Sequence, residues 1–276
     1  MNTGFFHHQI ITGPIRSRRL GLSLGVNLLP VSHKICNYDC LYCECGWNTV
    51  NTAETDALPT VKDIAEALSA KLQILKEENV KPESVTFSGN GEPTLHPDFK
   101  AVVSEVRRIV ETVYPDAPPA LTVLSNATRI GRDDVRDALG LCTRIVLKLD
   151  AGTPDTYARI NRLQTGFRLG AYEERMRPET FYEGLLAQLR AFPYPFIVQT
   201  LLFRGEYEGR MLDNTDGAEW EAYKRRLASI RPYGIMLYGL DRETPTRKLQ
   251  KLSKPELEAR AEALRMAGFK NVQAYF

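Results

Sequence analysis

The most informative stretch of the sequence reads Cys36-Asn37-Tyr38-Asp39-Cys40-Leu41-Tyr42-Cys43. It places three thiols in one short loop, with three residues between the first pair, two between the second, and the aromatic Tyr42 directly before the last. Thiolates are the usual ligands of iron–sulfur clusters, and a [4Fe–4S] cluster is fully coordinated by four cysteines. A loop that supplies three thiols therefore predicts such a cluster with one iron left open to another ligand.

The chain has five cysteines, and four of them fall between 36 and 45. In a reducing compartment this clustering indicates metal binding or catalysis rather than disulfide formation. Cys45 follows the loop too closely to hold the same cluster comfortably, and we interpret it as a bystander. Cys142 lies among apolar residues and is expected to be buried. The predicted metal ligands are therefore Cys36, Cys40 and Cys43.

The composition is ordinary for a globular protein, with 43% hydrophobic and 25% charged residues. The net charge is only +2, so there is no global field to attract nucleic acid. The charge is uneven, because residues 1–38 contain several basic residues and no acidic one. The chain shows neither a signal-peptide pattern nor an apolar run near the roughly 18 residues of a membrane span. We therefore expect a cytoplasmic protein without a membrane partner.

Short apolar strands alternate with helical patterns along the chain, which is typical of a mainly parallel sheet covered by helices. We interpret 60–78 as the first helix, with Thr60 as its N-cap, and 203–216 as a polar loop. The chain is predicted to close with a helix at 254–267 and an edge strand at 270–275. The other predicted strands are 20–28, 84–88, 121–124, 144–149, 196–202 and 233–239.

This order of elements predicts an α/β fold, either an incomplete (β/α) barrel or a doubly wound open sheet. In both folds the chemistry lies at the carboxyl ends of the strands. Polar residues do follow the predicted strands, among them Glu92, Asn126 and Asp150. We expect these residues and the cysteine loop to form one active site at the carboxyl ends of the strands.

The Cys-x3-Cys-x2-Cys spacing with an aromatic residue before the last cysteine resembles the signature of the radical S-adenosylmethionine (SAM) superfamily. The resemblance extends to Gly89-Asn90-Gly91-Glu92-Pro93, where that superfamily carries a Gly-Gly-Glu motif that binds the SAM amino group. The segments 16–21 and 241–245 resemble a subgroup of uncharacterised Fe–S oxidoreductases related to the wyosine-base synthases of tRNA.

The resemblance covers nearly the whole chain. It implies a partial (β/α)6 barrel of the radical SAM type, as a single domain over 1–276 with a core of about 20–240 and a C-terminal helix-strand extension of about 241–276. It also implies a [4Fe–4S] cluster and SAM as cofactors. The cluster would cleave SAM reductively, and the resulting 5′-deoxyadenosyl radical would abstract hydrogen from a substrate that the sequence does not identify. An electron donor such as flavodoxin or ferredoxin is implied as a partner.

By the same resemblance, Glu92 would accept a hydrogen bond from the SAM amino group, with Asn90 replacing the first glycine of the motif. Gly89 and Gly91 would let the backbone approach the ligand closely. We assign Tyr42 to the same cofactor site. The alternative is a glycine-rich turn with a solvated Glu92.

Two later strands supply further candidates for the SAM site. Ser125 and Asn126 end the strand 121–124, where superfamily members often carry a small polar pair that contacts SAM; the alternative role is a local cap for the next helix. In strand 196–202, either Gln199 or Thr200 faces inward, and we take Gln199 as the candidate.

Side chains alternate between the two faces of strand 144–149. The residues at 145, 147 and 149 are apolar and should pack under the helices, so Lys148 and Asp150 should point into the barrel. A buried lysine and a buried aspartate must be paired or bound to a ligand. We expect them beside SAM, with Asp150 on the ribose hydroxyls, or else as an internal ion pair without a ligand.

Arg16, Arg18 and Arg19 could line the approach to the cluster and bind an anionic group of the substrate, or form a solvated basic face. The kinship with wyosine synthases suggests an RNA base as the substrate. Two observations weaken this hypothesis. The wyosine-type enzymes bind a second cluster through additional N-terminal cysteines, whereas no cysteine precedes Cys36 here. The net charge is also small for a protein that binds tRNA through its phosphates.

Two alternative functions stay open. The first is a glycyl-radical-type activase or another protein-modifying enzyme. The second is a non-enzymatic binding or electron-transfer module stabilised by zinc or an Fe–S cluster. A zinc site would need four Cys or His ligands, and Cys45 and His33 could complete the number.

Overall fold

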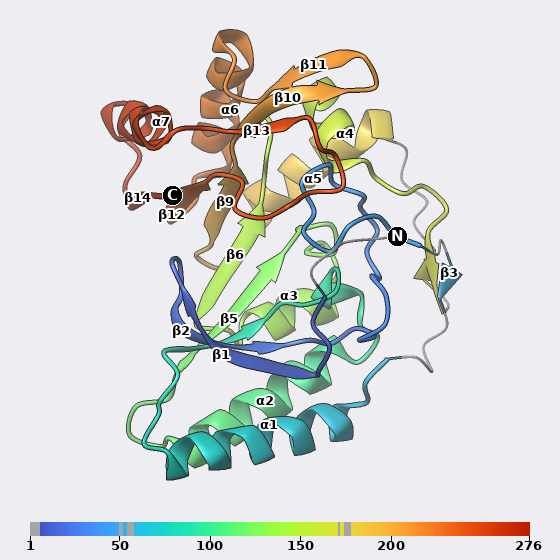
Figure 1. Cartoon of the computed structure of the whole chain (residues 1–276), viewed down its shortest axis with the longest axis vertical. Coiled ribbons are helices and arrows are strands. Elements are labelled where there is room, and N and C mark those ends of the chain that lie inside the picture. The colour runs from blue at the N-terminus through green and yellow to red at the C-terminus, as the bar shows by residue number, and fades with distance from the viewer. Residues whose placement is uncertain (1–5, 50–51, 54–57, 171, 174–177) are drawn as a thin grey trace.

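The computed structural model describes residues 6–49, 52–53, 58–170, 172–173 and 178–276. Its main sheet has eight strands in the order β1-β2-β4-β5-β6-β9-β12-β14, and every neighbouring pair is parallel except the antiparallel pair β1–β2. The sheet curls into a partial barrel (Figure 1). Its strands are β1 (Ile11–Ser17), β2 (Gly21–Val26), β4 (Ser84–Phe87), β5 (Ala120–Ser125), β6 (Arg144–Lys148), β9 (Ile197–Leu201), β12 (Gly234–Tyr238) and β14 (Val272–Tyr275).

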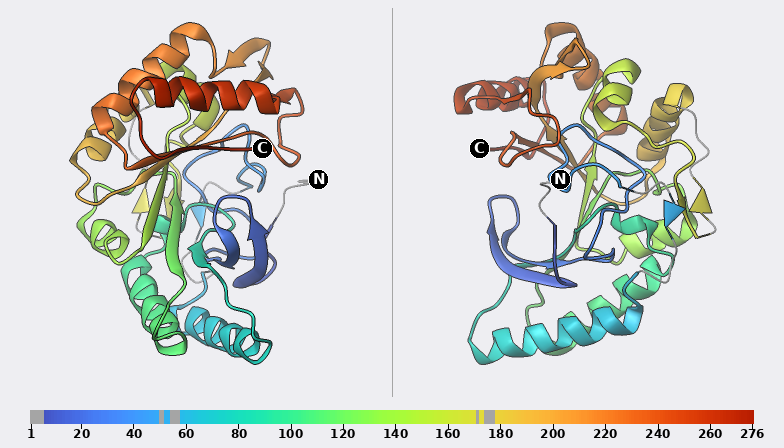
Figure 2. Two further views of the ribbon diagram at one scale, coloured as in Figure 1. Left: turned by 90° about the vertical axis from the view of Figure 1, so that its left-hand side faces the viewer. Right: turned by 45° about the vertical axis from the view of Figure 1, so that its right-hand side comes forward.

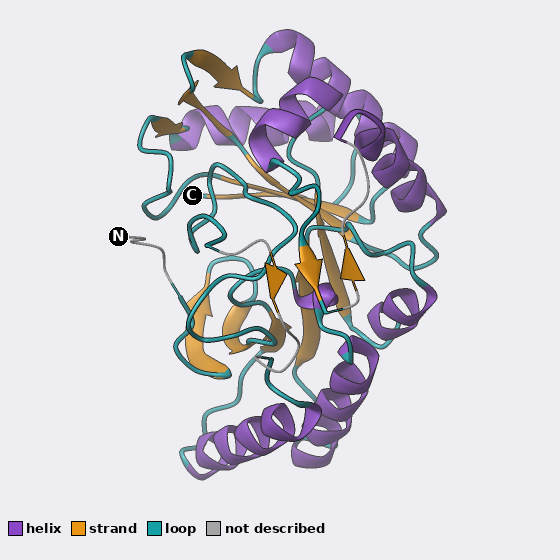
Figure 3. Cartoon of the chain, turned by 90° about the vertical axis from the view of Figure 1, so that its right-hand side faces the viewer, coloured by secondary structure: helices purple, strands orange, loops and turns teal. Residues whose placement is uncertain are grey.

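The helices form an arc around the outer face of this sheet, and loops fill much of its concave side (Figure 3). One large apolar cluster lies between the strands and the helices and makes the core of the molecule. The predicted partial barrel of strand–helix units is therefore confirmed. The α-helices are α1 (Val61–Glu77), α2 (Phe99–Val113), α3 (Asp133–Leu139), α4 (Pro154–Asn161), α5 (Pro178–Ala191), α6 (Gly217–Ile230) and α7 (Lys254–Met266), and a short 3-10 helix, η2, spans Pro93–Leu95.

The first helix shows how local sequence sets an element. Thr60 caps α1 by accepting a hydrogen bond from the backbone N–H of Asp63, whose carboxylate in turn accepts from the N–H of Thr60. This capping box satisfies N–H groups that have no partner inside the helix. One face of α1 is apolar and packs into the core, as the predicted helix at 60–78 required; its buried residues are Ile64, Leu68, Leu72 and Leu75.

The inner face of the sheet is markedly polar. Hydroxyls of neighbouring strands form a buried chain in which Ser23 contacts Thr86 at 2.8 Å, Thr86 contacts Ser84 at 2.9 Å, and Ser84 donates to Thr122 at 2.8 Å. In β6, Ile145 and Leu147 belong to the outer core. Alternation along a strand then turns the intervening residues toward the inside, as predicted.

Two predictions about strands were wrong. The segment before β2 forms an additional strand, β1, which pairs with β2 as an antiparallel hairpin. The segment 203–216, predicted as a polar loop, contains the hairpin β10 (Phe203–Tyr207) and β11 (Arg210–Asp213), extended by β13 (Leu249–Lys251). A further small sheet joins β3 (Thr52–Ala53), β7 (Arg168–Leu169) and β8 (Tyr172–Glu173).

The turn between β1 and β2 approaches the opposite end of the sheet. Arg18 forms an ion pair with Asp241, which follows β12, at 2.8 Å, and it also donates to the carbonyl of Phe276 beyond β14. The hairpin and the C-terminal strand lie on facing sides of the barrel opening (Figure 2). No helix in the described part of the chain has the length and apolar character to cross a membrane.

Candidate active site

The cysteine loop begins by docking onto the end of β4. Ile35 donates its N–H to the carbonyl of Asn90 at 2.9 Å, and its carbonyl accepts from the N–H of Glu92 at 3.1 Å, so that Ile35 and Gly91 form a parallel bridge. Gly91 has a φ of +137°, and a Cβ there would lie 1.8 Å from the Ile35 carbonyl oxygen. The glycine is therefore required for the approach of the cysteine loop itself.

The other side of the loop rests on the end of α4. The N–H of Asp39 donates to the carbonyl of Arg162 at 3.1 Å, and the N–H of Leu41 donates to that of Ile160 at 3.0 Å. The loop is thus held between the ends of β4 and α4 by backbone hydrogen bonds. These contacts fix where its thiols lie.

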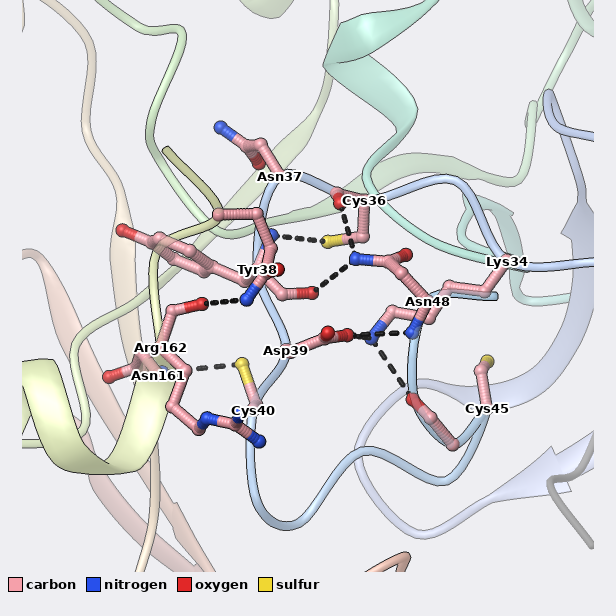
Figure 4. A network of polar contacts seen from close by, with 12 residues as sticks. Lys34, Cys36, Asn37, Tyr38, Asp39, Cys40, Cys45, Asn48, Asn161 and Arg162 are labelled. Carbon is pink, nitrogen blue, oxygen red and sulfur yellow. Dashed lines mark hydrogen bonds and ion pairs between the residues drawn. The ribbon is translucent and has the colours of Figure 1, made fainter. Parts of the chain in front are cut away.

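Polar side chains then close the loop upon itself (Figure 4). Lys34 is 1% exposed, and its ammonium donates to Asp39 Oδ1 at 3.1 Å and to the Gly46 carbonyl at 3.0 Å. Asp39 also accepts from the N–H of Asn48 at 2.7 Å. The Asn48 amide donates to the carbonyl of Cys36 at 2.8 Å. We call Lys34, Asp39, Gly46 and Asn48 the clasp. No periodicity or motif in the sequence predicts it.

Hydrogen-bond donors reach two of the thiols. The N–H of Tyr38 donates to Cys36 Sγ at 3.4 Å, and the Asn161 amide donates to Cys40 Sγ at 3.5 Å (Figure 4). Such donors stabilise thiolate ligands and tune a cluster that they hold. The Cys45 thiol faces the Gly89 carbonyl at 3.7 Å and is also a hydrogen-bond partner of the Cys43 thiol.

The three loop thiols differ in acidity. Burial raises the pKa of Cys36, and it raises that of Cys40 to about 11. A hydrogen bond from Cys45 lowers the pKa of Cys43 to about 6 against the effect of burial, and Lys34 contributes to the lowering. Among the described residues, no three His, Cys, Asp or Glu side chains converge closely enough to hold a single metal ion.

Glu92 lies buried where η2 begins. Its Oε1 accepts from the N–H and hydroxyl of Thr94, at 3.0 and 2.6 Å, and from the Ser125 hydroxyl at 2.8 Å. Its Oε2 accepts from the N–H of Asn126 at 2.6 Å. Burial raises the pKa of Glu92, although these hydrogen bonds oppose the rise. The predicted residues Glu92, Ser125 and Asn126 therefore meet, and Oε2 keeps room for a second donor.

Asn90 occupies a different environment from Glu92. Its side chain accepts from the N–H of His7 at 2.8 Å and donates to the carbonyls of His7 and Pro30, at 2.9 and 2.8 Å. Asn90 therefore anchors the N-terminal segment onto this loop through His7. Gly89 faces Asn27, whose side-chain oxygen a Cβ would meet at 2.1 Å.

Lys148 and Asp150 point inward as predicted and form an ion pair at 2.9 Å. The Asp150 carboxylate also accepts from the Tyr42 hydroxyl at 2.5 Å, from the Asn161 amide at 3.1 Å, and from the N–H of Leu201 at 2.9 Å. A carboxylate offers about four acceptor positions, and protein donors occupy all of them here. This arrangement matches the alternative of an internal ion pair, with Asp150 joining the cysteine loop to the barrel wall.

Lys148 is also embedded among tyrosines. Its ammonium donates to the Tyr238 hydroxyl at 2.8 Å and lies 4.7 Å from the centre of the Tyr42 ring. Burial alone would lower the pKa of Lys148, but Asp150 and Tyr238 reverse the effect and raise it. Lys148 is therefore a fixed cation inside the barrel.

The structure decides between the two candidates in β9. The Thr200 hydroxyl donates to the carbonyl of Leu149 at 2.8 Å and contacts Tyr223 in the outer core, so Gln199 takes the inner side. Two buried polar atoms near this point have no hydrogen-bond partner among the described residues: Gln199 Nε2 and Asn161 Oδ1. Buried amide groups left unpaired are costly, so a donor and an acceptor are available here for a polar ligand. This fits SAM beside the three thiols.

The predicted arginines are spread over the barrel opening. Arg18 is engaged with Asp241, as described above, and the Arg19 guanidinium lies 4.5 Å from the centre of the Tyr238 ring. Arg16 is exposed in β1. The structure therefore does not gather the three into one anion site.

A pocket of about 910 Å³ opens next to the cysteine loop. One of its walls, Leu240, packs in an apolar cluster with Tyr42, which places the pocket beside the last cysteine of the loop. Trp47 comes from the chain leaving the loop, and the Arg162 guanidinium lies 4.6 Å from the centre of its ring. The remaining lining residues are Thr49 and several residues of 241–251, which include both acidic and basic side chains.

Comparison with known proteins agrees with this site. The chain matches the family described as the Radical SAM superfamily over residues 31–207, which is more than half of its length. It is 28% identical over 260 residues to a UPF0026 protein of Synechocystis sp., covering 94% of this chain and 82% of that protein. It is also 28% identical to a UPF0026 protein of Methanocaldococcus jannaschii, covering 75% of this chain.

The chain spans only part of some relatives. It covers 53% of the Methanocaldococcus protein, and 32% of a protein of Brachyspira hyodysenteriae named GTPase Obg, to which it is 26% identical over 248 residues. Activities of those longer proteins therefore do not transfer directly.

Solved structures show the same fold. A radical SAM methyltransferase from Sphaerobacter thermophilus superposes with a TM-score of 0.62 at 15% identity, covering 92% of this chain and 65% of that one. TYW1 with a lysine-pyruvate adduct superposes with a TM-score of 0.54 at 17% identity, covering 88% of this chain and 73% of that one. Taken with the three-cysteine loop and the family match, these comparisons show that the chain belongs to the radical SAM superfamily, an enzyme family that uses a [4Fe–4S] cluster and SAM.

Proposed function

We propose that this protein cleaves SAM reductively and abstracts a hydrogen atom from a substrate. In this proposal Cys36, Cys40 and Cys43 hold the cluster, and Glu92 receives the SAM amino group on Oε2. When bound, the cluster supplies the electron that converts SAM into methionine and a 5′-deoxyadenosyl radical. The chain itself contributes binding, orientation and protection from water.

One observation carries the proposal. The cysteine loop and the Glu92 loop are built as a unit, through the bridge between Ile35 and Gly91. The Asn161 amide donates to Cys40 Sγ at 3.5 Å, and its oxygen is buried without a partner in the described structure, as is Gln199 Nε2. A loop with three thiols, a carboxylate fixed to that loop and an unpaired polar atom beside one thiol support a polar ligand bound next to the cluster.

The proposal is tested by anaerobic reconstitution with iron and sulfide. We expect a brown protein with roughly four irons per chain, which forms 5′-deoxyadenosine from SAM when reduced. Cys40→Ala should abolish this product, because it removes a cluster ligand. Cys45→Ala is the matched control and should keep both iron and activity, because Cys45 contacts Cys43 and Gly89 but is not one of the proposed cluster ligands.

Two results would contradict the assignment. If the purified protein is colourless and retains stoichiometric zinc, the radical SAM assignment is wrong and the alternative of a zinc-stabilised binding module is favoured. Loss of the cluster in the Cys45 variant would show that the ligand set is different.

We further propose that the substrate enters the pocket beside Trp47 and that it is an RNA base. Flexible or extruded bases are recognised by stacking on aromatic rings and guanidinium planes. Trp47, Arg162 and Tyr207 offer such a stack, because the guanidinium lies 4.6 Å and 5.3 Å from the two ring centres. The acidic and basic residues of the pocket supply acceptors and donors for a base edge.

Modified nucleosides would reveal this activity. RNA from cells with and without the protein is digested and compared by mass spectrometry, and one nucleoside should be missing in the deletion strain. Unchanged nucleosides together with a protein-linked modification would favour the alternative of a protein-modifying enzyme. A flavodoxin or ferredoxin is proposed as the electron donor, and either can be tested in place of the chemical reductant.

A further inference from the structure

Lys34 is a buried cation in the clasp of the cysteine loop. Its side chain is 1% exposed, and it lies two residues before the first cluster ligand. Its ammonium has one carboxylate partner, Asp39, and one carbonyl partner, Gly46. Replacing a buried ion pair by apolar residues of similar volume is often neutral or stabilising. Packing alone therefore does not explain a lysine here.

The surroundings of the ammonium suggest what the charge does. The ammonium is held inside the cysteine loop by Asp39 and Gly46, and it is also a hydrogen-bond partner of the Cys43 thiol. The charges of Cys36 and Cys40 act on it as well. Figure 4 shows Lys34 and Asp39 meeting across the ring that the loop forms. As thiolates, the three ligands bring three negative charges into a site where Cys36 is buried and Cys40 and Cys43 are half-buried. A fixed cation in the same ring offsets part of that charge.

An added electron makes such a site more negative still. In an environment of low dielectric constant, each nearby charge changes the free energy of reduction. A cation favours the reduced cluster, and an anion disfavours it. Lys34 and Asp39 therefore act in opposite directions on the same electron.

We infer that Lys34 is a positioning residue that closes the cysteine loop and sets the reduction potential of the bound cluster. It raises the potential by its charge, while Asp39 holds the ammonium in place and limits the effect. The inference rests on the cluster ligands of the proposed function, but not on SAM cleavage.

The test compares two single variants of the full chain after anaerobic reconstitution. Lys34→Met keeps the apolar stem and removes the charge, and Asp39→Asn keeps the shape and removes the opposing charge. Iron content is measured first, and the reduced cluster is then followed by electron paramagnetic resonance during a redox titration. At a fixed potential, we expect the ratio of reduced to oxidised cluster to fall about tenfold in Lys34→Met, which equals about 59 mV for one electron. It should rise in Asp39→Asn.

The matched control is Lys100→Met. Lys100 also pairs with an aspartate, Asp137, at 2.7 Å, but on the exposed surface of the helical layer. Its potential should equal that of the unchanged chain. A purely structural clasp would lower the iron content of both clasp variants without opposite shifts in potential.

The outcomes separate this inference from the proposed function. Equal potentials in the three variants, or shifts of the same sign for Lys34→Met and Asp39→Asn, would overturn the role of Lys34. If Lys34→Met binds no iron, an unchanged or lowered potential in Asp39→Asn would still overturn the inference. A chain that shows these shifts but forms no 5′-deoxyadenosine would refute the proposed function and leave the role of Lys34 standing.

Discussion

Gln199 and Thr200 are adjacent in β9, yet they serve opposite faces of the sheet. The Thr200 hydroxyl is satisfied in the outer core by Leu149 and Tyr223. The amide nitrogen of Gln199 is buried on the inner side and has no partner in the described structure. The pair therefore offers a direct comparison between a residue kept for stability and one available to a ligand.

We predict opposite results for two similar substitutions in this pair. Gln199→Leu removes a buried unpaired amide, so the free energy of unfolding should stay constant or increase. Its affinity for SAM should fall about tenfold, which corresponds to about 1.4 kcal/mol. Thr200→Val removes the hydrogen bond to the Leu149 carbonyl and leaves that buried carbonyl without its donor. The free energy of unfolding should fall by about 1–3 kcal/mol, and the affinity for SAM should not change. Urea denaturation and calorimetric titration with SAM measure both quantities, and unaltered SAM binding in Gln199→Leu would remove this residue from the site.

The next scale is the contact between the cysteine loop and the end of β4. The loop can approach only because residue 91 has no side chain and adopts a positive φ. The Gly89–Glu92 turn thus places a carboxylate at the site and at the same time supports the metal-binding loop. One short element positions both halves of the candidate active site.

Gly91→Ala should disrupt this element. Its Cβ would lie 1.8 Å from the Ile35 carbonyl oxygen, so we expect a loss of roughly 3 kcal/mol in stability and of most bound iron. The control is Gly166→Ala, at a φ of +81° with no atom within 4 Å of the added Cβ. It should cost only about 1–2 kcal/mol for its backbone conformation and keep the iron. Full iron content in Gly91→Ala would show that the loop docks in another way.

The elements that the sequence predicted well are those with strong local signals. The helix at 60–78 has a capping box and an apolar face, and six of the seven parallel strands are short, largely apolar runs. β1 was missed because Gly13 and Pro14 interrupt its pattern. The β10–β11 hairpin was missed because its strands are short and largely polar, and its pairing with β13 lies far away along the chain.

The candidate site shows the same division. The cysteines and Glu92 belong to short motifs, and the inward direction of Lys148 and Asp150 follows from alternation in β6. Asn161 could not be predicted, since it reaches Cys40 only after α4 has packed against the loop. The same holds for Lys34, whose partners lie later in the loop and are brought to it by the backbone path.

At the scale of the whole molecule, the sheet is open, and its two ends approach each other at one turn. Arg18 in the β1–β2 turn contacts Asp241 after β12, and the neighbouring Arg19 lies over the Tyr238 ring. Tyr238 in turn contacts Lys148 inside the barrel. Contacts therefore run from the barrel opening to the interior without a break.

Arg18→Ala should loosen this junction without unfolding the chain. Its ion pair with Asp241 is 40% and 48% exposed, so the global loss should be only about 0.2–1 kcal/mol. Amide hydrogen exchange in β1 and β14 should nevertheless become faster, because both lie at the edges that Arg18 joins. Arg16→Ala serves as the control, since Arg16 is exposed in the same strand and forms no ion pair in the described part of the chain. Identical exchange in the two variants would exclude a bracing role for Arg18.

The clasp around the cysteine loop also affects what happens to the protein when the cluster is lost. Because Lys34, Asp39 and Asn48 hold the loop with protein groups alone, the conformational entropy of the loop is lost when the chain folds. If oxygen destroys the cluster, the cysteine loop should therefore keep its conformation. We expect that the cluster can be destroyed in air and reconstituted anaerobically several times, and that its absorbance returns each time without refolding of the chain. One protein molecule could then bind a new cluster after each loss.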